Sequence, residues 1–135
     1  MKSVNQNAEV PLHVWTEPDD GGKTVLGAIE SAIYSVDISI YELGGPKILD
    51  SLLTAKKNGA RIRIMFNAQF FVGNDPSNEK YSQQFAIKAA LEAGEGEHKP
   101  ELHWSCNNFN ITHQKTIIID ARTDIGNDTL PETAK

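Results

Sequence analysis

The sequence predicts an α/β fold in which a mixed β-sheet is flanked by helices. Apolar residues alternate in several short segments, as in strands, and recur at three- and four-residue steps in the segments between them, as in helices. The predicted order is β-α-β-α-β-α-β-β, and such alternation of strands with helices is typical of a layered α/β domain. The 135 residues suffice for one domain with its own apolar core.

The first predicted elements are a strand, a helix and a second strand. The segment LHVWT, residues 12–16, alternates as a strand does, and the turn sequence EPDDGG follows it. Either Asp19 or Asp20 is available to cap the helix predicted over 23–34. The segment VDISIY, residues 36–41, alternates again and predicts a strand that is at least half-buried.

The break GGP at 44–46 precedes a second helix, which ends at KKNG with two lysines in its last turn and Gly59 in the C-cap position. A strand over 60–66 follows, and then a helix over 77–93. On that helix we expect the packing residues to be Tyr81, Phe85, Ala89 and Leu91. Two strands over 101–105 and 112–120 complete the sheet, and the polar segment 121–135 is predicted to be a loop or a frayed end.

The composition bounds the function only loosely. A general nucleic-acid binder is more often basic than a chain with a formal charge of −5, although a local basic cleft remains compatible with that charge. Cys106 is the sole cysteine, so no internal disulfide can form. No apolar run approaches the roughly 20 residues of a membrane span, and the N-terminal residues lack the apolar stretch of a signal peptide. The compartment is therefore either cytoplasmic or that of a mature exported form.

The stretch NITHQKTIIID, residues 110–120, contains the residues with chemical potential. In an extended strand His113, Lys115, Ile117 and Ile119 share one face. Because both faces of the strand are apolar, we expect it to lie inside the sheet and to be covered on both sides. An imidazole and an ammonium held together repel each other when both are charged, so an anion between them would relieve the repulsion. Without further support, the two side chains would be solvent-facing residues at a strand end.

The spacing His-x-Lys-x-x-x-x-Asp, formed here by His113, Lys115 and Asp120, resembles the signature of the phospholipase D superfamily. The run IESAIYSVDISIYELGGPKILDSLLTAKKNGARIRIMF also resembles the part of that family's lobe that precedes the motif. The similarity covers residues 12–120, which we take as the core of a single phospholipase D-like domain spanning 1–135.

The resemblance implies a metal-independent phosphodiesterase without a cofactor. It implies that His113 is the nucleophile, forming a phosphohistidine, or the acid, and that Lys115 holds the non-bridging phosphate oxygens. Asp120 follows Lys115 by five residues, so a regular strand turns it to the opposite face, and we expect it to have an orienting or structural role rather than one in proton transfer. A histidine from a second copy of the motif completes the site, so the resemblance also implies a homodimer or a second lobe.

Three functions follow as expectations. The first is hydrolysis of phospholipid head-group phosphodiesters, the second is a homodimeric endonuclease of the same superfamily, and the third is a non-catalytic lobe that binds phosphate or a partner. The family's Gly-Ser-x-Asn-like element after the motif is replaced by DIGNDT, so Gly126 and Asn127 receive no role. A zinc site built from His98, His103, Cys106 and His113 matches no common ligand spacing, and no metal site is predicted.

Overall fold

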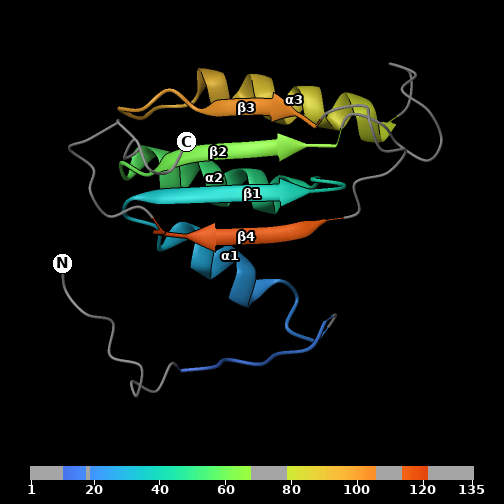
Figure 1. Cartoon of the computed structure of the whole chain (residues 1–135), viewed down its shortest axis with the longest axis vertical. Helices are drawn as coiled ribbons and strands as arrows, with labels where there is room; N and C mark the ends of the chain where they lie inside the picture. The colour runs from blue at the N-terminus through green and yellow to red at the C-terminus, as the bar shows by residue number, and fades with distance from the viewer. Residues whose placement is uncertain (1–10, 18, 68–78, 106–113, 122–135) are drawn as a thin grey trace, which may run out of the picture.

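A computed structural model describes residues 11–17, 19–67, 79–105 and 114–121. Strands and helices alternate along the chain, apart from the last two strands (Figure 1). The elements are α1 (Lys23–Glu30), β1 (Ser35–Ile40), α2 (Pro46–Lys57), β2 (Arg61–Phe66), α3 (Glu79–Ala93), β3 (Glu101–Trp104) and β4 (Lys115–Ile119). The predicted α/β class with a mixed sheet is confirmed.

The four strands form one sheet in the order β3-β2-β1-β4. The first three strands are parallel, whereas β4 runs antiparallel to β1, with Ile40 opposite Lys115 and Val36 opposite Ile119. The carboxyl ends of the three parallel strands therefore lie beside the amino end of β4. We call this row of strand ends the carboxyl edge of the sheet.

The helices of the described chain lie on one side of the sheet (Figure 1). Alternation along the strands directs Val36, Ile38, Ile62, Ile64 and Phe66 toward them, and each of these side chains is at most 4% exposed. The helical side of this core comes from buried residues of all three helices or their ends: Ile29, Ala32, Leu52, Ala55, Ile87 and Leu91. Burial of these side chains stabilises the layered arrangement by about 1.5–3 kcal/mol for each large residue.

The strand predicted over 12–16 is wrong. These residues belong to no strand of the described sheet, and Leu12 and Val14 are 88% and 77% exposed. Alternation alone predicted this strand, but an isolated alternating segment gains a strand conformation only where a neighbour pairs with it.

The expected burial of the motif strand on both faces is also wrong. Strand β4 lies at an edge of the sheet, and Ile118 is 47% exposed on the side away from the helices. Ile117 and Ile119, on the helical side, pack against the core as predicted.

The face of α3 is only partly as predicted. Leu91 is fully buried, but Ala89 is exposed and Phe85 retains 45% exposure while its ring lies 5.0 Å from that of Trp104. The buried polar residue on this face is Gln84, and the side chain of Tyr81 lies outside the described residues.

The helix ends agree only in part with the prediction. The N-cap residue of α1 is Gly22, which makes no side-chain cap hydrogen bond, whereas the Asp20 carboxylate accepts from the Thr24 backbone N–H at 2.7 Å from two residues further upstream. The C-cap residue of α2 is Asn58, and Gly59 after it adopts a φ of +102°, a conformation that favours glycine over residues with a Cβ. Helix α1 ends at Glu30, earlier than the predicted residue 34.

Candidate active site at the carboxyl edge of the sheet

Lys115 lies at the edge of the sheet where the parallel strands end. It is the first residue of β4 and pairs with Ile40, the last residue of β1. In open α/β sheets the crevice outside the carboxyl ends of the strands is where ligands bind. The exposed ammonium of Lys115 therefore occupies the position in which an anionic ligand is expected.

The side chain of Lys115 lies over an aromatic ring. Its Nζ is 5.9 Å from the centroid of the Tyr41 ring, and Tyr41 is only 9% exposed. The Tyr41 N–H donates to the carbonyl of Gln114 at 2.9 Å, which extends the β1–β4 ladder by one pair. The Gln114 side chain points to the other face, where its Oε1 accepts from the Ser39 hydroxyl at 3.0 Å. Alternation thus places Lys115 on the helical face.

His113 lies outside the described residues, so its expected pairing with Lys115 remains a prediction. The residue after it, Gln114, and Lys115 are both fixed to the end of β1 by the ladder. His113 is two residues before Lys115 in the sequence.

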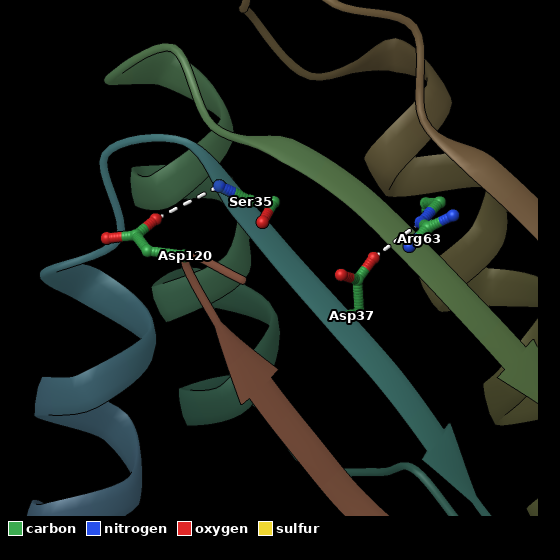
Figure 2. A network of polar contacts seen from close by, with 4 residues as sticks. All are labelled: Ser35, Asp37, Arg63 and Asp120. Carbon is green, nitrogen blue, oxygen red and sulfur yellow. Dashed lines mark hydrogen bonds and ion pairs between the residues drawn. The ribbon is translucent and has the colours of Figure 1, made fainter. Parts of the chain in front are cut away.

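Asp120 lies at the opposite end of β4 from Lys115. Five residues of extended chain separate the two, which is roughly 16 Å. The Asp120 carboxylate accepts hydrogen bonds from the backbone N–H groups of Ile33, Tyr34 and Ser35 at 3.0, 2.7 and 3.0 Å. Figure 2 shows the bond from Ser35. In return the Asp120 N–H donates to the Ser35 carbonyl at 2.8 Å.

These contacts make Asp120 an acceptor for the turn between α1 and β1. Partial burial opposes ionisation of the carboxyl, but the hydrogen bonds from Ser35, Tyr34 and Ile33 together outweigh it, so the pKa of Asp120 lies below its ordinary value. The residue also adopts a φ of +53°, which aspartate tolerates better than most residues. The structure thus brings Asp120 to the backbone of the α1–β1 turn and not to Lys115.

The face of the sheet opposite the described helices carries an ion pair. Arg63 of β2 pairs with its cross-strand neighbour Asp37 of β1, as Figure 2 shows. The hydrogen bond from Arg63 to Asp37 raises the pKa of the guanidinium, against the opposing effect of burial. His103 and Met65 lie in the next row of this face, which encloses a broad hollow of about 450 Å³. This hollow lies across the sheet from the Lys115 side chain.

The basic segment KKNGARIR does not form a cluster of exposed cations. Lys56 is 3% exposed, and its Nζ donates to the carbonyls of Leu91 and Gly94 at 2.6 and 2.7 Å. Because Arg63 pairs with Asp37, these two cations serve packing within the fold.

No group of three or more candidate metal ligands occurs among the residues that the structure describes. His103 is exposed on the open sheet face, as its alternation with Leu102 and Trp104 predicts, while Cys106 and His113 of the considered zinc set lie outside the described ranges. In the same described part of the chain, no helix has the length and apolarity that crossing a membrane requires.

Sequence reasoning missed the contact between Tyr41 and Lys115 and the burial of Lys56. The only sequence signal for Tyr41 is its place at the end of an alternating strand, in the segment IYELGG. Which side chain it meets depends on the pairing of β1 with β4, which local periodicity does not specify.

The fold and this edge define a class of protein: an α/β domain that presents a cation of an H-x-K motif where parallel strands end. The chain belongs to the phospholipase D-like family, because the family described as "Cardiolipin synthase, PLD-like domain" matches residues 25–127. This match confirms the superfamily that the motif and its upstream run indicated. Members of that superfamily are generally phosphodiesterases.

A solved structure gives the same assignment. The chain is similar to Nuc from Salmonella typhimurium, a phospholipase D family member, with 28% sequence identity and a TM-score of 0.59. The similarity covers 77% of this chain and 60% of that one, so the chain matches less than two thirds of its solved relative. No curated protein matches the sequence.

Proposed function

We propose that this chain supplies one half of a phosphodiesterase site in which His113 is the nucleophile or the acid and Lys115 binds the phosphate. The observation that carries the proposal is the exposed Lys115 at the carboxyl edge of the sheet, in a chain of the phospholipase D-like family. A fixed ammonium stabilises negative charge that builds on the non-bridging oxygens in the transition state.

The reaction proceeds in two displacements. The neutral imidazole of one motif histidine attacks phosphorus, an N–P bond forms, and the bond from phosphorus to the leaving oxygen breaks. The histidine of the second motif gives its proton to that oxygen. Water then attacks phosphorus, an O–P bond forms and the N–P bond breaks, and the proton of the water passes to the second histidine, so both histidines return to their starting states. His113 takes one of these two roles.

A phospholipid is the substrate that the surroundings favour. The connection between β1 and α2 and the start of α1 line an apolar groove of about 370 Å³, whose residues include Leu26, Pro46 and Ile48. This connection begins at Tyr41, which lies under Lys115. An apolar groove on the connection that starts at Tyr41 suits a substrate that joins an apolar part to a phosphodiester.

Hydrolysis by the full chain tests the proposal. Three substrates separate the alternatives: phosphatidyl ester vesicles, single-stranded DNA, and the small diester bis(p-nitrophenyl) phosphate. We expect activity on the vesicles and the small diester. His113→Asn and Lys115→Met should each lower kcat/KM by at least about a hundredfold without a change in fold.

The matched control is Lys57→Met, because the Lys57 side chain is 70% exposed and α2 ends there just before the start of β2, at the opposite end of the strands from Lys115. Unchanged turnover by a folded His113→Asn variant would refute the catalytic assignment. Cleavage of DNA without hydrolysis of the vesicles would favour the endonuclease function over the phospholipase function. Phosphate binding without turnover of any substrate would favour the non-catalytic lobe.

A further inference from the structure

Tyr41 joins three elements at the candidate site. Its N–H donates to the Gln114 carbonyl of the motif segment at 2.9 Å, and its carbonyl accepts from Nε2 of Gln84, on α3, at 3.4 Å. Its ring lies 5.9 Å from Nζ of Lys115. Backbone contacts thus fix the residue on both sides, and its ring faces the cation of the motif.

The contact between Gln84 and the Tyr41 carbonyl places a buried amide in the core, which lowers the stability of the fold. Gln84 is 1% exposed, and its Oε1 has no hydrogen-bond partner in the described part of the chain, while its Nε2 donates to the Tyr41 carbonyl. A buried unsatisfied acceptor destabilises a fold. An apolar side chain at position 84 would avoid this cost, but it would also leave the Tyr41 carbonyl without its donor.

A ring below an ammonium does something that an aliphatic core residue cannot do. A lysine side chain has four rotatable bonds and loses considerable rotamer freedom when it is fixed in one place. The negative face of an aromatic ring within about 6 Å attracts the ammonium and limits the positions that the ammonium takes before the substrate binds. Preorganised charge stabilises a transition state without reorganisation at the moment of reaction.

We propose that Tyr41 is a positioning residue, which holds the Lys115 ammonium where the phosphoryl oxygens develop charge. The inference rests on the proposed function, in which Lys115 binds those oxygens. It assigns the role to the ring face of Tyr41 and not to its hydroxyl.

The kinetic test compares Tyr41→Phe with Tyr41→Leu in the full chain, on bis(p-nitrophenyl) phosphate. The phenylalanine variant keeps the ring and should retain kcat/KM within about threefold, whereas the leucine variant should lose about tenfold. In a Lys115→Met background the leucine substitution should have no further effect, because the two residues act as a unit. The matched control is Tyr34→Leu, at the residue just before the opposite end of β1.

A second readout does not depend on activity. The ring should shift the NMR signals of the Lys115 ε-methylene protons upfield in the wild type and in Tyr41→Phe, and the shift should vanish in Tyr41→Leu. Should the leucine variant fail to fold, Tyr41→Met takes its place in both measurements.

The outcomes separate the two proposals. Absence of the ring shift in the wild type, or equal losses in the two Lys115 backgrounds, would overturn the positioning role. A wild type that shows the shift but hydrolyses no phosphodiester would refute the proposed function, and with it any catalytic purpose of the contact. Equal losses in Tyr41→Phe and Tyr41→Leu would assign the role to the hydroxyl and also overturn the inference.

Discussion

Asp120 and Ser35 are joined by a reciprocal pair of hydrogen bonds: the Ser35 N–H donates to the Asp120 carboxylate at 3.0 Å, and the Asp120 N–H donates to the Ser35 carbonyl at 2.8 Å. This pair connects the end of the motif strand to the start of β1. With the bonds from Ile33 and Tyr34, it makes the third motif residue a structural tie.

We expect Asp120→Asn to lower the free energy of unfolding by about 1–2 kcal/mol, because a neutral amide oxygen accepts hydrogen bonds more weakly than a carboxylate does. Asparagine tolerates the φ of +53°, so the change isolates the charge. Urea denaturation measures it. The control is Asp50→Asn, on the exposed side of α2, and an equal loss there would remove the special role of Asp120.

The same carboxylate predicts a pH dependence. The pKa of Asp120 is lower in the folded than in the unfolded chain, so its contribution is fully present above the unfolded value of about 3.9 and is lost as the pH falls through the folded value. The difference in unfolding free energy between wild type and Asp120→Asn should therefore be constant above about pH 5 and shrink below pH 4. A difference that grows on acidification would contradict the assignment.

Two adjacent lysines should differ sharply in their effect on stability. Lys56→Met leaves the Leu91 and Gly94 carbonyls without their donor near the end of α3, and should cost about 2–4 kcal/mol. Lys57→Met removes only an exposed pair with Glu95 at 3.6 Å and should change stability by less than about 0.5 kcal/mol. Thermal unfolding of both variants checks this, and similar melting temperatures would show that the Lys56 contacts contribute little.

Phosphodiesterase activity should survive EDTA. In the proposed reaction the imidazole of the motif and the ammonium of Lys115 supply nucleophile and electrophile, so no step requires a divalent ion. Turnover before and after dialysis against chelator provides the measurement. Loss of activity that returns on adding a divalent ion would require another mechanism.

Activity should require two motifs. The nucleophile and the acid act on opposite sides of phosphorus, so His113 of one chain cannot perform both roles. A homodimer with facing His113 residues, or pairing with a second lobe, meets the requirement. Across a dilution series, the molar mass from light scattering and the specific activity should fall together. Full specific activity from a demonstrated monomer would refute the requirement for two motifs.

The sequence predicts the local elements well and their surroundings less well. The helix ending at KKNG and the strands over 36–41 and 60–66 follow from periodicity and turn residues, which act over a few positions. Ile118 was expected to be buried because Ile117, Ile118 and Ile119 are all apolar, but burial depends on what covers each face. Such a run therefore does not distinguish an edge strand from an interior one.

The candidate site was predictable only through its motif. Strand alternation predicts that Asp120 lies on the other face from Lys115, whereas its hydrogen-bond partners in the turn between α1 and β1 come from distant pairing that alternation does not specify. The contact of Lys115 with Tyr41 arises from pairing between distant segments. The burial of Lys56 contradicts the usual solvation of lysine at a helix end, because its carbonyl partners belong to another helix.

The large sequence separation between Asp120 and its hydrogen-bond partners has a consequence for the order of folding. The hydrogen bonds of Asp120 close loops of 85 to 87 residues, whereas the Asp37–Arg63 pair between β1 and β2 closes one of 26. The longer loop costs about 1 kcal/mol more in chain entropy, and distant contacts are characteristically late to form. The parallel strands and their helices would thus assemble first, with β4 added to a sheet that already exists. Lys115 would reach Tyr41 only in that final step, so the core of the parallel strands and helices would form before the candidate active site is assembled.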